Sequence, residues 1–194
     1  CSLLRNPMFK VTNSSGKNLI DDLSSSITSL KSHWEGSDAV ANLADLAKVY
    51  TAVTDLIKNL QKLIVSVNND EVLPLQKHIN ASGGYCTVGS ELSFSLNVDS
   101  NIEVPTEAAE FRTDDAITSD AETFNVFPTK FENFVNELNA TKDELFNNWK
   151  EGANRAEVEK MFTEFNGNVP DFKTQITKVR DNLNIVAENK KNLL

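Results

Sequence analysis

The side chains that most often carry catalysis or bind metal ions are scarce in this chain. Its 194 residues include two histidines and two cysteines, fewer than most zinc sites use. The sequence has no P-loop, no serine nucleophile elbow and no HExxH motif, and Cys86 has no histidine close to it. We therefore predict a protein that is not an enzyme and that holds no cofactor and no metal ion.

Carboxylates are the one chemically active group that clusters. Residues 83–126 carry nine acidic side chains against Arg112 alone, and this segment accounts for almost all of the net charge of −9. Such a run could supply oxygen ligands to Ca²⁺, but it lacks the glycine-pivoted spacing of an EF-hand loop. We interpret it as a solvated acidic loop that could steer a basic partner. Because binding sites are common on loops that a rigid scaffold positions, we place the partner surface here, at Tyr85, Glu107, Glu110, Asp114, Asp115 and Asp120.

Composition excludes several other classes of partner. A net charge of −9 argues against nucleic acid, whose binding needs a basic stripe that displaces counterions. No apolar run approaches the roughly 20 residues that a membrane span needs. The chain is 40% hydrophobic and long enough to bury a real core. We predict a folded chain without a membrane span whose partners are other proteins.

The two cysteines leave three interpretations open. Cys1 could be the lipidated first residue of a mature surface lipoprotein, and thus a membrane anchor. Cys1 and Cys86 could instead form a disulfide, which would indicate an oxidising compartment. The third interpretation is two unrelated thiols. Together with the features below, these observations favour a secreted or cell-surface location.

The elements that must position these residues are mainly helices. In residues 1–82, apolar side chains recur at steps of three and four over 19–34 and again over 43–67, as on amphipathic helices. Trp34-Glu35-Gly36 separates the two stripes, and Leu73-Pro74-Leu75 interrupts the second one. We predict an antiparallel helical hairpin over 1–82, with Trp34 and Gly36 in its turn.

Residues 127–194 repeat this plan. An apolar stripe runs from Phe127 to Trp149, the turn is Trp149-Lys150-Glu151-Gly152, and a second stripe continues to Val186. Pro170 lies inside that second stripe, where its ring removes a helical hydrogen bond, so we expect a kink or a break there. Trp149 and Gly152 are the turn residues of this second hairpin.

Between the hairpins, residues 83–126 change periodicity. From Leu92 to Val98 apolar and polar residues alternate, as in a half-buried strand. Residues 85–88 are the predicted partner strand, joined through Gly89-Ser90. The expected fold is therefore mostly α: two antiparallel helical hairpins forming a four-helix bundle, with a small β-hairpin insert and an acidic loop.

The Trp34-Glu35-Gly36 turn between two amphipathic helices resembles that of the WXG100 (ESAT-6-like) family over residues 13–68, and residues 127–192 resemble a divergent second copy. The resemblance implies hairpins that pair antiparallel into four-helix bundles and that type VII systems export. The family's export signal is a tyrosine, then three residues, then an acidic residue, and it follows neither second helix here.

These observations predict a non-enzymatic, WXG100-like exported or surface-associated protein that acts by protein–protein interaction. Two alternatives remain: a lipid-anchored surface binding protein or adhesin whose bundle is a stalk, and a carrier whose bundle opens around an apolar ligand. In oligomeric state, we expect either a monomeric fused pair of hairpins or a homodimer.

Overall fold

The computed structural model describes residues 5–193, which are mostly helical with one small antiparallel sheet. This confirms the predicted fold class at that level. The elements are α1 (Arg5–Lys10), η1 (Val11–Gly16), α2 (Lys17–His33), β1 (Trp34–Glu35), α3 (Ser37–Ser66), η2 (Val67–Val72), α4 (Leu73–Ala81), β2 (Arg112–Thr113), α5 (Ala116–Phe124), α6 (Phe127–Asn148) and α7 (Ala153–Asn192), where η denotes a π-helical turn.

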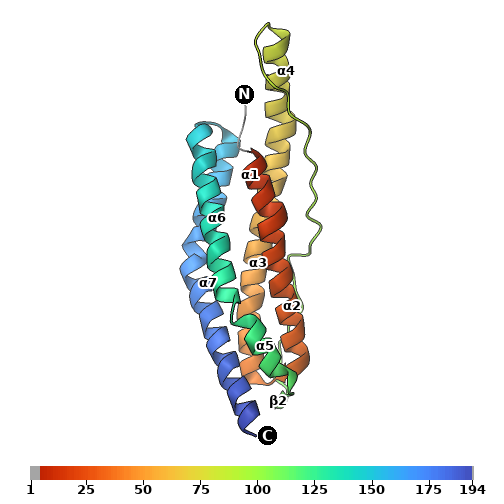
Figure 1. The fold of residues 1–194 in the computed structure, drawn as a ribbon, viewed down its shortest axis with the longest axis vertical. Coiled ribbons are helices and arrows are strands. Elements are labelled where there is room, and N and C mark those ends of the chain that lie inside the picture. The colour runs from red at the N-terminus through yellow and green to blue at the C-terminus, as the bar shows by residue number, and fades with distance from the viewer. Residues whose placement is uncertain (1–4, 194) are drawn as a thin grey trace.

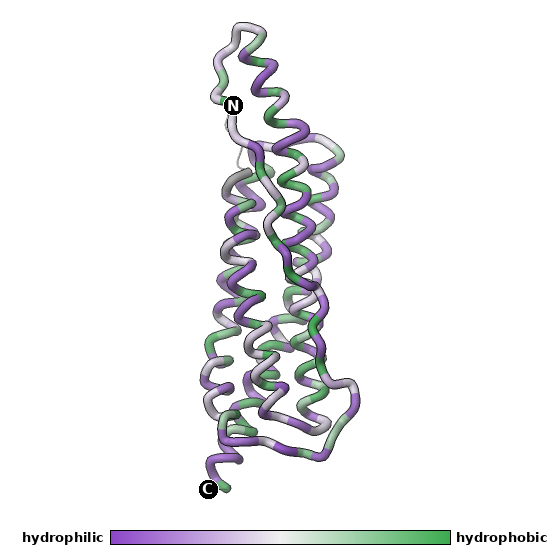
Figure 2. Tube along the Cα trace, turned by 90° about the vertical axis from the view of Figure 1, so that its right-hand side faces the viewer, coloured by the Kyte–Doolittle hydropathy of each residue, from purple (hydrophilic) through white to green (hydrophobic). Residues whose placement is uncertain are grey.

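The long helices lie side by side along the longest axis of the molecule (Figure 1). α2 contacts both α3 and α6, while α7 contacts α3, α5 and α6. Hydrophilic and hydrophobic residues alternate along each helix (Figure 2), and the apolar faces of all four long helices contribute to one continuous core. Each helix therefore buries its apolar stripe against its neighbours.

The second helix of the first hairpin does not stop at Pro74. α3, η2 and α4 run on without a break from Ser37 to Ala81, so the expected interruption at Leu73-Pro74-Leu75 is wrong. The N–H of Leu73 donates to the carbonyl of Asn68, five residues earlier. A π-helical turn widens the helix just before the proline, which leaves room for a ring that lacks an N–H.

Pro170 does not break α7 either. The helix is continuous over 40 residues with Pro170 inside it, so the expected break is wrong. The rings of Phe165 and Phe172, one on each side of the proline, lie 6.2 Å apart. Val169 and Ile176 are buried in the core. Packing on both sides of the proline therefore compensates for the one backbone hydrogen bond that it removes.

The predicted β-hairpin does not exist. Residues 84–99 contain no strand, and residues 85–88 do not pair with 92–98. This segment instead runs extended along the outside of the helices (Figures 1 and 2). Leu96 is buried against the core and Ser95 beside it is exposed, so the alternation does mark a half-buried extended segment. The prediction was wrong about what this segment packs against, which is a helix and not a second strand.

The small sheet forms elsewhere, at the turn of the first hairpin. β1 pairs antiparallel with β2, with Trp34 opposite Thr113 and Glu35 opposite Arg112. Gly36 then turns the chain into α3 with a φ of 126°, a conformation that side chains with a Cβ rarely adopt. A Cβ at this position would lie 3.2 Å from the Cα of Phe111.

Three glycine-to-alanine substitutions should rank by this geometry. Gly36→Ala is expected to lower the free energy of unfolding by about 2 kcal/mol or more, because backbone strain adds to the clash with Phe111. Gly152→Ala has a φ of 129° but an open surrounding, so it should cost about 1 kcal/mol. Gly167 lies within α7 with nothing near its Cβ position, and Gly167→Ala should stabilise by about 0.5–1 kcal/mol. Urea unfolding measures all three, and equal effects at Gly36 and Gly167 would contradict this account.

Candidate functional site

The turn of the first hairpin is the most elaborate surface feature. Trp34 is 1% exposed, and the backbone N–H of Asp114 donates to the carbonyl of His33 at 3.2 Å. The guanidinium of Arg112 donates twice to the carboxylate of Glu35, at 2.9 and 3.2 Å. β2 and its flanking residues therefore cover this turn and hold the acidic segment against it.

A cavity of about 710 Å³ lies between this turn and residues 102–109. Apolar and charged side chains line it together, among them Val40, Ile102, Val104, Lys31 and Glu107. Trp34 also lines the cavity, and its buried Nε1 has no hydrogen-bond partner among the described residues. The volume of this cavity is in the range of ligand sites. The charged group of Lys31, however, already donates a hydrogen bond to the carbonyl of Glu103 at 2.9 Å.

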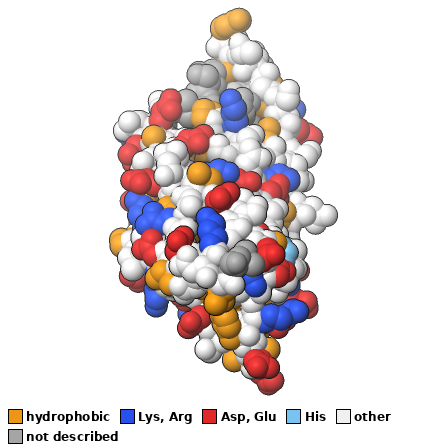
Figure 3. Space-filling view, turned by 60° about the horizontal axis from the view of Figure 1, so that its bottom comes forward, with side chains coloured by type: hydrophobic (Ala, Val, Ile, Leu, Met, Phe, Trp, Pro, Cys, Tyr) orange, Lys and Arg blue, Asp and Glu red, His pale blue; other side chains and the backbone are white. Residues whose placement is uncertain are grey.

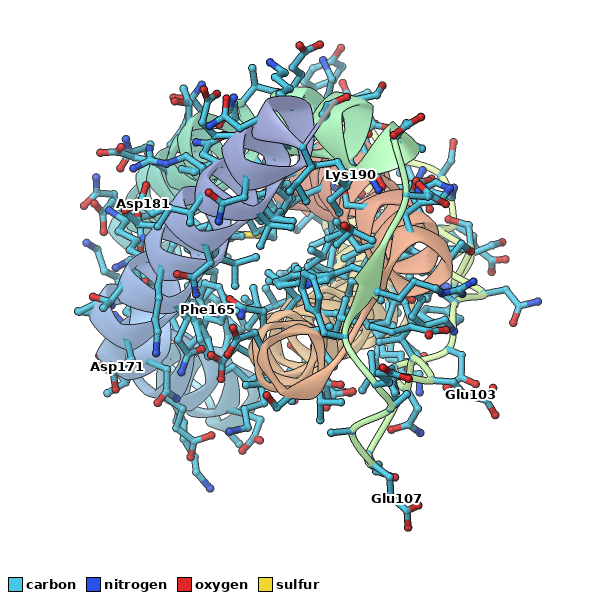
Figure 4. The ribbon with its side chains drawn as sticks, turned by 90° about the horizontal axis from the view of Figure 1, so that it is seen from below. Glu103, Glu107, Phe165, Asp171, Asp181 and Lys190 are labelled. Carbon is cyan, nitrogen blue, oxygen red and sulfur yellow. The ribbon has the colours of Figure 1, made fainter. Side chains whose placement is uncertain are left out.

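The predicted partner-surface residues do not form one site. Glu107, Glu110, Asp114 and Asp115 are exposed near the end of the molecule that carries β2, where Figure 4 shows Glu107 directed away from the helices. Tyr85, which is 94% exposed, comes four residues after α4, the helix at the opposite end of the molecule. Acidic and basic side chains are also interspersed around the β2 end (Figure 3). Sequence position alone therefore overstates both the clustering and the uniform charge of this surface.

Asp120 belongs to an internal contact. Its side chain is 12% exposed and accepts hydrogen bonds from Ser29 Oγ at 2.6 Å and from His33 Nδ1 at 2.6 Å. The hydrogen bond with Asp120 raises the pKa of His33 above 6.5, its burial opposes this, and attraction to Asp120 and Asp114 adds to the rise. α5 thus turns this carboxylate toward α2, away from the exposed carboxylates of the acidic segment, and its role on a partner surface stays a prediction.

The turn of the second hairpin is built differently. Trp149 is half-buried, and its carbonyl accepts a hydrogen bond from Arg155 Nε at 2.7 Å. The guanidinium of Arg155 also lies 4.5 Å from the ring centre of Phe146. Gly152 has a φ of 129°. No strand pairs with this turn in the described residues, so a cation–aromatic contact takes the place that β2 takes in the first hairpin.

A polar network that was not predicted from the sequence holds residues 85–100. We name this extended segment the strap. Polar side chains of α3, η2 and α4 bind its backbone. The donors and acceptors are Tyr50, Thr51, Lys58, Gln61, Asn68, Asn69, Gln76 and Asn80. Most of them recur at intervals of three to eight residues on one side of a continuous helix, a polar periodicity that could have signalled this role.

Two asparagines of this network imitate a neighbouring strand. Asn69 accepts from the N–H of Leu92 at 2.9 Å and donates to its carbonyl at 2.8 Å. Asn80 does the same with Cys86, at 2.7 and 2.6 Å. A side-chain amide offers one donor and one acceptor like a peptide group, so each of these residues satisfies both backbone groups of one strap residue.

Cys86 lies at the α4 end of the strap. It is 4% exposed and disulfide-bonded. Cys1, which the sequence offers as an anchor or a disulfide partner, lies outside the described residues. The lipid anchor at Cys1 stays a prediction.

Residues 5–193 contain no group of three His, Cys, Asp or Glu side chains placed to hold a metal ion. No helix in the same range is long and apolar enough to cross a membrane. No family model, curated protein or solved structure matches this chain. Function must therefore be argued from the geometry.

The His33–Asp120 pair predicts a pH-dependent stability. Because folding raises the pKa of His33, the extra stability is fully present below pH 6.5 and is lost as the pH rises through the folded-state pKa. His33→Gln should lower the free energy of unfolding at pH 5.5, by up to about 1 kcal/mol for this partly exposed pair, and by less at pH 8.5. Urea unfolding at both values measures this, with His78→Gln as the control. An equal loss at both values would contradict it.

The strap network predicts a local effect. Asn69→Ala removes both hydrogen bonds to the Leu92 backbone and should destabilise the protein by about 1–3 kcal/mol. It should also speed hydrogen exchange of the Leu92 amide. Asn59→Ala is the matched control, because Asn59 is exposed on the same helix and does not bind the strap. Unchanged exchange at Leu92 would contradict the proposed pairing.

Proposed function

We propose that this chain is a fused pair of WXG100-like hairpins, folded as a four-helix bundle, which acts outside the cytoplasm by binding other proteins. The observation that carries this proposal is the repeated turn. Trp34 and Trp149 each end one long helix, and Gly36 and Gly152 each begin the next with a positive φ. These paired features support two copies of one hairpin plan.

The arrangement of the two hairpins supports a pair within one chain. The α2–α3 turn and the α6–α7 turn lie at opposite ends of the molecule (Figure 1), and α2 contacts α6 while α3 contacts α7. Lys130 of α6 lies 3.0 Å from Asp22 of α2. Joining two hairpins covalently raises their effective concentration to the level of an intramolecular contact.

A protein-binding role is supported by what the bundle displays. The side chains of Glu107, Glu110, Asp114 and Asp115 remain exposed at one end, on irregular segments that the helices position. The disulfide at Cys86 supports an oxidising, extracytoplasmic location.

Zero-length cross-linking tests the fused pair. A carbodiimide should join Lys130 to Asp22, whose charged groups are 3.0 Å apart, within a chain that sediments as a monomer. Asp22→Asn should remove this link. The Lys17–Asp21 link within α2, whose charged groups are 2.8 Å apart, is the internal control and should be unchanged in this variant. Mixed ¹⁴N and ¹⁵N chains reveal the source of the link. A Lys130–Asp22 link found only between chains would overturn the fused pair.

Export tests the second half of the proposal. In cells that make this protein and carry a type VII system, deleting the ATPase of that system should retain the chain inside the cells. A protein secreted through a cleaved signal peptide is the control and should be unaffected. Equal amounts of the chain in the medium of both strains would contradict type VII export without bearing on the proposed fused pair.

A further inference from the structure

The two edges of the strap differ in how well their backbone groups are satisfied. In an extended chain the N–H and C=O of one residue point to the same edge, and successive residues face opposite edges. Most even-numbered strap residues bind the helices: besides Cys86 and Leu92, the carbonyl of Ser90 accepts from Asn68 at 2.9 Å. The N–H of Leu96 donates to Gln61 at 3.0 Å. This edge is paired to α3, η2 and α4.

The carbonyls of Val98 and Ser100 extend the same pattern. They accept from Lys58 Nζ at 2.9 Å and from Thr51 Oγ1 at 2.8 Å. Backbone groups of six even-numbered residues are therefore paired with one continuous helical surface, whereas those of Val88 and Phe94 are not paired with any group in residues 5–193. Two odd-numbered residues near the ends of the strap also bind this surface: the N–H of Gly89 donates to Gln76 at 2.9 Å, and the carbonyl of Asp99 accepts from Tyr50 at 2.9 Å.

The odd-numbered edge is largely open in its central part. The backbone groups of Glu91, Ser93 and Asn97 make no hydrogen bond within the described residues. Ser95 between them donates its N–H to Gln61 at 2.9 Å and leaves its carbonyl without a hydrogen bond. All four residues are exposed, and the strap lies on the outside of the helices (Figure 2). An unpaired edge of this kind is a template for another strand.

The charge of the strap limits which strand can bind. Glu91 and Asp99 are exposed, and residues 85–104 carry no Lys, Arg or His. A second copy paired antiparallel about Ser95 would place Glu91 opposite Asp99, and like charges in directly opposed positions destabilise a sheet. A strand that places basic residues opposite Glu91 and Asp99 gains two favourable cross-strand pairs instead.

We propose that the odd-numbered edge of residues 91–97 binds an extended, basic segment of a partner protein by strand addition, with Lys or Arg opposite Glu91 and Asp99. The mode is β-augmentation, in which main-chain hydrogen bonds supply affinity and side chains at alternate positions supply specificity. This inference rests on the proposed protein-binding function and names the chemistry of the partner.

Hydrogen exchange of the free protein tests the geometry first. The amides of Leu92 and Leu96 donate to Asn69 and Gln61 and should exchange slowly. The amides of Ser93 and Asn97 should exchange rapidly. Amide-resolved NMR on the full chain measures all four. Equal exchange on both edges would overturn the proposal before any ligand is added.

Peptide binding then tests the partner chemistry. The probe is a synthetic peptide, Lys-Thr-Val-Thr-Val-Thr-Val-Thr-Lys, blocked at both ends, and its matched control has Glu at both ends. At low salt the lysine peptide should bind about tenfold tighter, as two reversed charge pairs imply. It should protect the Ser93 and Asn97 amides. The double variant Glu91→Lys with Asp99→Lys should reverse the preference.

A backbone variant separates strand addition from simple charge attraction. Ser93→Pro removes an N–H from the free edge, whereas Ser93→Ala keeps it. Ser93→Pro should weaken peptide binding at least several-fold while Ser93→Ala leaves it unchanged, and an unchanged Leu92 amide shows that the strap is still in place.

Three results would overturn the proposal: no protection at Ser93 and Asn97 with the lysine peptide in large excess, equal binding of both peptides, or concentration-dependent dimerisation that protects these amides without peptide. The last result would assign the edge to a second copy of the chain. None of the three bears on export or on the Lys130–Asp22 cross-link, so this inference and the proposed function fail independently.

Discussion

Each helical hairpin of this protein has an apolar face that it cannot bury alone, and the rest of the structure depends on the mutual burial of these two faces. When the apolar stripe of a helix is wider than its hairpin partner can cover, the rest of the stripe must be buried by further helices. Here α2 and α3 receive it from α6 and α7. The single core that results keeps α7 continuous through Pro170 and keeps α3 to α4 continuous past Pro74. Tertiary packing thus overrides two local breakers that would end an isolated helix.

Alongside this apolar core, polar side chains of the helices hold the strap by hydrogen bonds to its backbone. Backbone N–H and C=O groups that lie against a protein surface need partners, and a single extended segment cannot supply them to itself. Side-chain amides of Gln61, Asn69 and Asn80 do so from a helix. The helix therefore takes the place of a neighbouring strand, and it satisfies mainly the even-numbered edge of the strap. The strap is held in an extended conformation without a second strand. Because one of its faces packs on the helices and the other is exposed, its hydrophobic alternation looks like that of a strand in a hairpin.

Much of this fold could be predicted from the sequence because helical periodicity is a strong local signal. The positions of both tryptophan turns and the apolar stripes follow from it. What could not be predicted is which surface an extended segment will meet, since the alternation around Leu96 is the same against a strand or a helix. Charge counting could not show the environment of Asp120 for a related reason. Its environment is decided by how α5 docks beside Ser29 and His33, a contact between residues far apart in the chain.

The length of the segment between the hairpins also determines how the two hairpins are oriented relative to each other. α4 ends at one end of the molecule and α5 begins at the other (Figure 1), so residues 82–115 must travel the full length of the helices before the second hairpin starts. A connection of only a few residues would start that hairpin where α4 ends, and would invert it so that both tryptophan turns lay at the same end. The long connection thus sets the orientation of one hairpin relative to the other. Gene fusion of two hairpins by a short loop would not have reproduced this architecture.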